Sequence, residues 1–332
     1  MSTSLFDKVK KSDFTEKISL VIALIGLVAV FSILNVNYLS VQNILNILVA
    51  CSLMGFIAIG ETYLIIAGQI DLSVGAIAAF AGVLAAGGVR AGFHPIPVTI
   101  LAIIAGGIVG LCNATAINYL KIQPFIATLA SMSIMRGFAY IICNGKPFAV
   151  SNSLFISFGT FRFFNLVPLP VVLLIAAFII FGFILKRTYF GRSVYVIGGN
   201  PYAARLAGLN PVSIIYRLYL ISGCLAALAG VLLAARMNSG QPPAATGVEF
   251  DAVTAAVLGG TAFTGGVGTM LGTLLGMLIL QGFNTGLIML NVQIFWQNVA
   301  QGMLLVVALA FDFYRKRSMA KKVLEESLKN AS

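Results

Sequence analysis

The sequence predicts an all-α integral membrane protein of about ten transmembrane helices. Hydrophobic residues make up 59% of the chain and charged residues only 9%. Globular domains carry about 25% charged residues, so this chain cannot cover itself with a water-soluble surface. Apolar runs of roughly 20 residues, the length of a helix that crosses the hydrocarbon core, recur from one end to the other. Lys and Arg concentrate in a few of the connections between these runs.

The apolar runs define the expected helices in chain order. The longer runs cover residues 18–34, 44–67, 97–120, 124–143, 167–185, 212–235, 267–290 and 294–311. Two shorter or glycine-interrupted runs, residues 72–89 and 251–265, complete the set. The hydrophilic N-terminus lacks a small-residue cleavage site, so the first run is expected to be a retained helix rather than a signal peptide.

Basic residues predict the orientation, because cytoplasmic connections hold the excess of Lys and Arg. With this set of spans, the basic clusters before the first helix, between the sixth and seventh, and after the last fall on one side. Both termini are therefore expected in the cytoplasm. We expect a cytoplasmic segment over residues 1–17, one transmembrane domain over residues 18–312 and a cytoplasmic basic tail over residues 313–332.

The residue content argues against several function classes. The formal net charge is +11, but the basic residues lie at span ends rather than together on one solvated face, which argues against nucleic-acid binding. The chain has one histidine, His94, and no HExxH or GxSxG motif, so neither an enzyme nor a metal or cofactor site is expected. No GxxxxGK[ST] phosphate loop occurs, so ATP would have to act through a partner protein.

The segment GQIDLSVG, residues 68–75, joins the second and third runs and contains two candidate functional residues. Asp71 lies at a predicted helix start, with Ser73 close behind it. An Asp in this position accepts hydrogen bonds from free amides and complements the helix dipole. The alternative is a broken helix beside a translocation path, since glycines interrupt spans where backbone lines a cavity.

Two charged residues fall inside predicted spans, Glu61 in the second and Arg136 in the fifth. Either charge alone in hydrocarbon costs roughly 3 kcal/mol or more, so both are expected to face protein, water or each other. Thr128 and Arg136 share one face at helical spacing, as residues that line a pathway would. A structural ion pair between Glu61 and Arg136 is the alternative.

The run GGTAFTGGVGTMLGTLLG, residues 259–276, contains glycines four residues apart that let helix backbones approach closely, namely Gly268, Gly272 and Gly276. The glycines that precede them, Gly265 and Gly266, predict either tight packing or a mobile break that acts as a gate. Asn284 follows on the same predicted helix. Amides in membranes bond neighbouring helices more often than substrates, yet a sugar needs such neutral hydrogen bonds.

The outer connection over residues 144–165 is rich in Phe. Such amphipathic segments lie along the lipid interface. A docking surface for an external protein is a compatible alternative.

The segment KRTYFGRSVYVIGGNPYAARLAGLNP, residues 186–211, is a polar and basic island in this apolar chain. Asn200 and Pro201 predict a helix start, followed by one short surface helix over residues 202–209 that Pro211 closes. A loop of this length with its own helix is usually functional. The alternative is an anchor at the lipid headgroups through Arg205.

Four separated motifs together resemble the permease subunit of bacterial ABC importers for ribose and related monosaccharides. They are GQIDLSVG, TLASMSIMRG, GRSVYVIGGNPYAARLAGLNP and AAVLGGTAFTGGVGTMLGTLLG, within a resemblance that runs from residue 39 to residue 312. It implies a type II importer-like permease of the bacterial cytoplasmic membrane, surrounded by lipid. The implied protein partners are a cytoplasmic ABC ATPase, a periplasmic sugar-binding protein and a second permease copy.

The resemblance also implies that the island enters a groove on the ATPase. This coupling role is carried over to residues 200–211, with Tyr202, Arg205 and Leu209 as expected contacts. The implied function is ATP-driven import of ribose or a related pentose or hexose. A branched-chain amino-acid permease, an ion-coupled secondary transporter and a membrane scaffold without transport are the alternatives.

Overall fold

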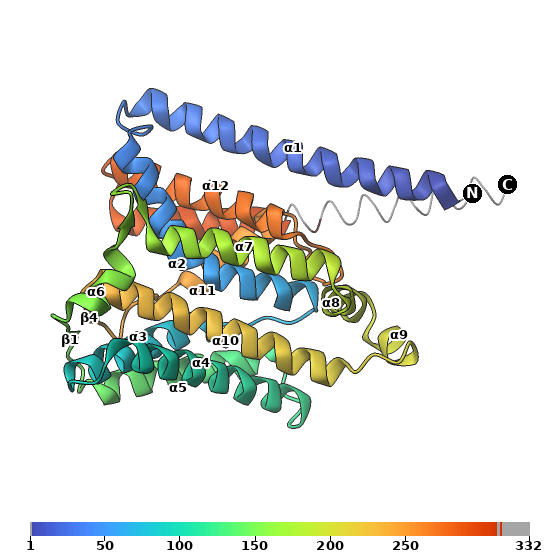
Figure 1. Ribbon diagram of the computed structural model, residues 1–332. Helices are drawn as coiled ribbons and strands as arrows, with labels where there is room; N and C mark the ends of the chain where they lie inside the picture. Colours follow the sequence, from blue (N-terminus) through green and yellow to red (C-terminus); the bar gives the residue numbers. More distant parts are fainter. Residues whose placement is uncertain (1, 311–312, 314–332) are drawn as a thin grey trace.

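The computed structural model describes residues 2–310 and residue 313, and this part of the chain is a bundle of helices (Figure 1). The first six helices are α1 (Ser2–Leu34), α2 (Val41–Ile66), α3 (Val74–Arg90), α4 (Pro95–Asn118), α5 (Pro124–Ile142) and α6 (Ser153–Thr160). They are followed by α7 (Leu169–Arg187), α8 (Tyr189–Gly199), α9 (Pro201–Leu206), α10 (Pro211–Arg236), α11 (Val248–Leu258) and α12 (Met270–Met289). The all-α membrane fold expected from the sequence is confirmed.

The remaining elements are short. Two-residue strands form two antiparallel pairs, β1 (Phe148–Ala149) with β4 (Ser239–Gly240), and β2 (Arg162–Phe163) with β3 (Val167–Pro168). In the described residues, 7 helices are long and apolar enough to cross a membrane. Shorter apolar helices cover Val74–Arg90 and Ile294–Ala310.

Two expected boundaries differ from the structure. The run expected over residues 251–265 ends as a helix at Leu258, because Gly259 and Gly260 follow and Gly260 has a φ of 87°. At the other end, α1 begins at Ser2 rather than near residue 18, since no Gly or Pro interrupts the chain before Gly26. The expected basic tail lies outside the described residues, apart from Phe313.

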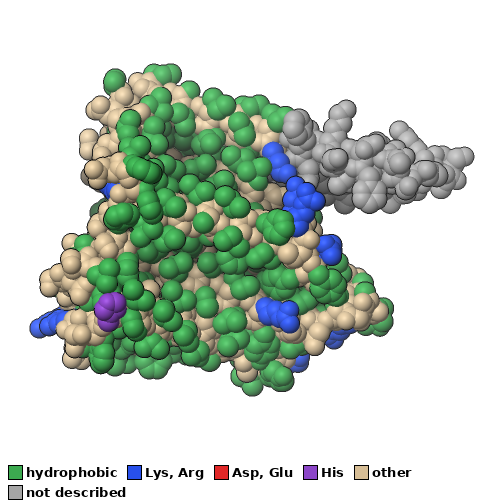
Figure 2. Space-filling view, viewed as in Figure 1, with side chains coloured by type: hydrophobic (Ala, Val, Ile, Leu, Met, Phe, Trp, Pro, Cys, Tyr) green, Lys and Arg blue, Asp and Glu red, His purple; other side chains and the backbone are tan. Residues whose placement is uncertain are grey.

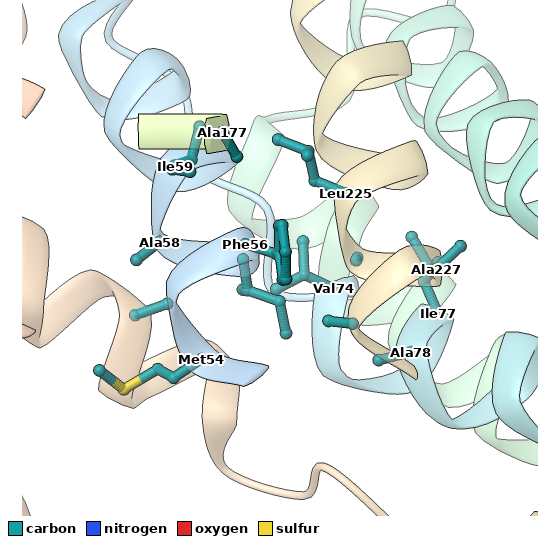
Figure 3. Close-up of a cluster of buried hydrophobic side chains, with 14 of the residues drawn as sticks. Met54, Phe56, Ala58, Ile59, Val74, Ile77, Ala78, Ala177, Leu225 and Ala227 are labelled. Carbon is teal, nitrogen blue, oxygen red and sulfur yellow. The ribbon is translucent and has the colours of Figure 1, made fainter. Parts of the chain in front are cut away.

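Helix α10 is the centre of the bundle and packs against α2, α3 and α4. Glycines allow the backbones to touch: a Cβ at Gly223 would overlap the Gly106 carbonyl oxygen, and one at Gly230 would overlap that of Ala78. Figure 3 shows the apolar side chains that fill the space between these helices, including Phe56 of α2. Small residues therefore set the helix spacing in the core.

The two ends of the bundle differ in character. One end carries α6 and the β1–β4 pair, and the opposite end carries α8, α9 and the start of α1 (Figure 1). Figure 2 shows Lys and Arg gathered mainly at the α8–α9 end, with hydrophobic side chains over the flank between the ends. This distribution is what the predicted topology requires, with the polar island and the Phe-rich connection on opposite sides.

Helix α6 holds the Phe-rich connection against the bundle. Phe155 is fully buried, and a Cβ at Gly159 would overlap the backbone of Arg236 at the end of α10. Asn152 caps the helix by accepting a hydrogen bond from the Phe155 amide at 3.1 Å. Phe164 at the tip of the connection is exposed. A lipid-facing and a protein-docking role for this segment both stay predictions.

Candidate functional site

The polar island folds as two helices joined at Asn200. Thr188 caps α8 by accepting from the Gly191 amide at 3.1 Å. Asn200 caps α9 by accepting from the amides of Tyr202 and Ala203, each at 3.0 Å. Pro201 occupies the first position of α9, where its missing N–H costs nothing. The helix start predicted at Asn200 and Pro201 is confirmed.

Other details of the island differ from the prediction of one helix closed by Pro211. Helix α8 was not expected, and α9 ends at Leu206, with Gly208 at a φ of 78° just beyond it. Pro211 instead occupies the first turn of α10 and is buried. Leu209 packs against the hydrophobic core. Leu209 is partly buried and Pro211 is buried, and an ATPase-contact role for either residue stays a prediction.

The outward surface of the island is formed by α9. Tyr202 is 72% exposed and Leu206 is 76% exposed, with Arg205 also exposed between them. Two large apolar side chains beside a cation form a surface of the composition that protein interfaces favour. Leu206 belongs to this surface, although sequence reasoning named Leu209 in its place.

The inner surface of the island is fixed to the bundle by α8. The Tyr195 hydroxyl donates to the Gly268 carbonyl oxygen at 2.7 Å. The Phe190 ring stacks on Tyr63 of α2, with ring centroids 6.3 Å apart. A Cβ at Gly198 would overlap the carbonyl oxygen of Ile66, the last residue of α2. Three separate contacts thus connect α8 to α2 and to the segment before α12.

The glycine-rich loop between α11 and α12 also contacts the end of α2 at Ile66. Gly265 and Gly266 adopt φ values of 88° and 76°, which L-residues rarely adopt. The Gly266 amide donates to the Ile66 carbonyl oxygen at 2.8 Å, and the Ala262 amide donates to Val267 at 2.9 Å. The loop is therefore a hydrogen-bonded turn against α2, and a gating role for it stays a prediction.

Close packing by the following glycines is confirmed. A Cβ added at Gly272 would overlap the carbonyl oxygen of Gly259, and one added at Gly276 would overlap the carbonyl oxygen of Ala255. A Cβ at Gly268 would lie 2.8 Å from the Ile66 side chain. This stripe brings the backbones of α11 and α12 together.

Asp71 and Ser73 form a buried polar chain with α4. The Asp71 carboxylate accepts from the Ser73 amide at 2.9 Å and from the Ser73 hydroxyl at 2.5 Å. Asn113 in turn donates to the Ser73 hydroxyl oxygen at 2.9 Å. The Tyr219 hydroxyl of α10 donates to the Ile70 carbonyl oxygen at 2.9 Å. These bonds hold the connection between α2 and α3 inside the bundle.

The ion pair considered between Glu61 and Arg136 is not formed. Glu61 is fully buried, and neither carboxylate oxygen has a hydrogen-bond partner among the described residues. Arg136 donates to the carbonyl oxygens of Pro242 and Ala244 at 2.6 and 2.7 Å. The carboxylate within electrostatic range of Arg136 belongs to Glu249, at the start of α11.

Thr128 and Asn284 are buried at separate places. The Thr128 hydroxyl donates to the Pro124 carbonyl oxygen of its own helix at 2.8 Å, so this side chain is used locally. The side-chain amide oxygen of Asn284, Oδ1, has no hydrogen-bond partner in the described part of the chain. A role for Thr128 or Asn284 in a translocation path stays a prediction.

Sequence reasoning missed Glu249. This carboxylate is buried, it lies within electrostatic range of Glu61, and its Oε1 accepts from the Gly247 amide at 3.2 Å. A Cβ at Gly75 would overlap Glu249 Oε2. The available signal was an acidic residue in an apolar segment, which by default indicates function. Glu61, Asp71 and Glu249 are the buried carboxylates of the described bundle.

Comparison with known proteins gives consistent matches. The family described as "Branched-chain amino acid transport system / permease component" matches residues 43–309. The ribose import permease protein RbsC of Bacillus subtilis is 40% identical, over 91% of this chain and 94% of the relative. The L-arabinose ABC transporter permease protein AraH of Azospirillum brasilense is 37% identical, over 90% of this chain and 87% of the relative. The ribose import permease protein RbsC of Escherichia coli K12 is 37% identical, over 88% of this chain and 92% of the relative. No solved structure matches.

These matches and the apolar helices identify a multi-pass protein of the bacterial inner membrane. Its relatives are transport permeases, so the chain is a transport component and not an enzyme. The family match spans most of the sequence, from α2 to the helix that follows α12. The chain belongs to the permease family of binding-protein-dependent ABC importers, within which it is similar to the ribose-type permeases.

Proposed function

We propose that this chain is the membrane subunit of an ATP-driven importer that moves a monosaccharide, ribose or a related pentose or hexose, into the cell. The observation that carries the proposal is the similarity to ribose and arabinose permeases over about nine-tenths of the chain. The buried amide of Asn284 supports a neutral substrate, because its side-chain oxygen has no hydrogen-bond partner among the described residues and carries no net charge.

Energy would enter from the α8–α9 end. The exposed surface formed by Tyr202, Arg205 and Leu206 is the proposed contact with a cytoplasmic ABC ATPase. A periplasmic sugar-binding protein would dock at the opposite end, over α6 and the Phe164 tip. Two copies of the chain would enclose the sugar path. ATP-driven closure of the ATPase subunits would then move the ends of the bundle helices and open the path alternately to each side.

Reconstitution with the cognate ATPase and binding protein tests the substrate. Proteoliposomes are supplied in separate assays with labelled ribose, arabinose and leucine. We expect ATP-dependent uptake of one of the sugars and none of leucine. Leucine uptake would instead favour a branched-chain amino-acid permease, the function in the description of the matching family. No uptake of any solute by the complete, ATP-hydrolysing complex would indicate a scaffold.

Charge reversal tests the coupling surface. Arg205→Glu replaces an exposed cation in α9, and we expect it to abolish binding-protein-stimulated ATP hydrolysis while membrane insertion is unchanged. Lys121→Glu is the matched control, because Lys121 is an exposed cation in the connection between α4 and α5, outside the α8–α9 segment and outside the proposed docking surface for the binding protein. Equal stimulation in wild type and Arg205→Glu would contradict the assignment of α9 to ATPase coupling.

A further inference from the structure

At Gly198, the end of α8 contacts the bundle through its backbone. Gly198 lies so close to the Ile66 carbonyl oxygen that no Cβ fits between them, and that Cβ would also lie 2.8 Å from the Gly266 amide nitrogen. The same Ile66 carbonyl accepts the hydrogen bond of the Gly266 amide at 2.8 Å. One carbonyl group at the end of α2 thus joins the island to the loop that precedes α12.

The neighbouring turns reinforce this contact. A Cβ at Gly265 would lie 2.7 Å from the Gly198 carbonyl oxygen and 3.1 Å from the Gly68 amide nitrogen. Gly68 and Gly265 both have positive φ values, 72° and 88°. Three chain turns, after α2, at the end of α8 and before α12, therefore meet where side chains would keep them apart. Direct backbone contact leaves no flexible side chain to absorb a displacement.

The helices on the far side of this contact are also joined to each other. The hydroxyls of Thr62 in α2 and Thr273 in α12 lie 2.7 Å apart and share a hydrogen bond. The Gly268 position just before α12 packs against the Ile66 side chain, and its carbonyl accepts from Tyr195 of α8. Because α2 and α12 are bonded to each other, a displacement of α8 would act on both helices together.

The covalent link from the island to α10 makes no such backbone contact at Gly208, although Leu209 beside it packs against the core. Gly208 has a φ of 78°, and a Cβ there would meet nothing within 4 Å. The link between α9 and α10 thus lacks the close backbone contact found at the end of α8. Rigid contact favours transmission through α8 into α2 and α12.

We infer that Gly198, the Ile66 carbonyl and Gly266 form a backbone junction that passes movement of the α8–α9 segment to α2 and α12, with Gly198 as its positioning residue. This inference rests on the proposed function, since it presupposes an ATPase that moves α9. The junction does not bind ATP, sugar or the ATPase. The junction determines how much α2 and α12 are displaced when the ATPase displaces the α8–α9 segment.

Adjacent glycines provide a matched pair of variants. Gly198→Ala places a Cβ against the Ile66 carbonyl, whereas Gly199→Ala places one where nothing lies within 4 Å. Both variants are reconstituted with the ATPase and binding protein, and uptake of labelled ribose or arabinose and ATP hydrolysis are measured together. We expect Gly198→Ala to retain the ATPase in the purified complex but to lower sugar uptake per ATP hydrolysed by about fivefold or more. Gly199→Ala is expected to match wild type.

A second variant covers the case in which Gly198→Ala fails to assemble. Tyr195→Phe keeps the ring and removes the hydroxyl that donates to the Gly268 carbonyl oxygen. We expect a smaller decrease in uptake per ATP, in the same direction. A wild-type ratio in Gly198→Ala, or in Tyr195→Phe if Gly198→Ala does not assemble, would overturn the junction. Absence of ATP-dependent uptake by wild type would overturn the proposed function, which separates the two failures.

Discussion

Asn113 shows how a single buried side chain joins elements in this bundle. Its amide donates to the Ser73 hydroxyl, which itself donates to Asp71, so α4 is connected to the turn that starts α3. Hydrogen bonds between membrane helices contribute about 0.6 kcal/mol on average, and up to about 1.7 kcal/mol. The polar chain therefore contributes modestly to stability and chiefly fixes the position of the turn.

Replacing Asn113 tests this connection. We expect Asn113→Leu, similar in volume, to lower the free energy of unfolding by about 1 kcal/mol, because the bond to Ser73 is lost. Asn118→Leu is the matched control, since Asn118 is buried in the same helix but donates only to Ala114 of that helix. Thermal unfolding in detergent compares the two variants. A larger loss in Asn118→Leu would contradict the inter-helix role of Asn113.

Individual site residues were predictable where the signal was local. The cap at Asn200 follows from a few neighbouring residues and is present. Asp71 accepts from a backbone amide as expected, but the helix start expected at Asp71 lies at Val74, with Ser73 as the N-cap residue. The partner of Arg136 was not predictable, because carbonyl groups of Pro242 and Ala244 reach it from more than one hundred residues away along the chain. Spacing within one helix carries no information about such contacts.

Helix α10 shows the same contrast at the scale of elements. Its apolar run predicted a span over residues 212–235, and the helix covers Pro211–Arg236. Helix α8 was missed, since it is short and lies in a polar segment without membrane-length hydrophobicity. The central place of α10 also came only from the structure, where glycines such as Gly230 let it approach α3 and α4.

Alanine at Gly230 tests the close approach of α10 to α3. A Cβ there would overlap the Ala78 carbonyl oxygen, so we expect Gly230→Ala to destabilise the protein by about 1–3 kcal/mol through overpacking. Gly137→Ala in α5 is the matched control, because nothing lies within 4 Å of its Cβ position. That control is expected to be neutral or to gain up to about 1 kcal/mol from helix propensity. Equal melting temperatures for both variants would count against backbone contact at Gly230.

The whole molecule places its polar island and its Phe-rich connection at opposite ends of the bundle (Figure 1). This separation agrees with the charge distribution that predicted the orientation. The sequence predicted most spans because hydropathy is a local property. How the spans pack, and which ends of them meet the island, depends on small residues whose contacts are distant in the chain, such as Gly198 with Ile66.

Cysteine labelling tests the orientation. In a variant without the native cysteines, Tyr202→Cys and Phe164→Cys each provide one exposed thiol. We expect a membrane-impermeant maleimide to label Phe164→Cys in intact spheroplasts and Tyr202→Cys only in inside-out vesicles. The reverse pattern would place α9 outside the cell and remove the basis for ATPase coupling.

The energy source is the most direct test of the central claim, that this chain is the permease of an ATP-driven sugar importer. Proteoliposomes with permease, ATPase and binding protein are assayed for uptake of labelled ribose and arabinose, with ATP inside, without ATP, and with a protonophore. We predict uptake that requires ATP and the binding protein and that the protonophore leaves unchanged. Uptake that proceeds without ATP and collapses with the protonophore would contradict the account and indicate an ion-coupled transporter.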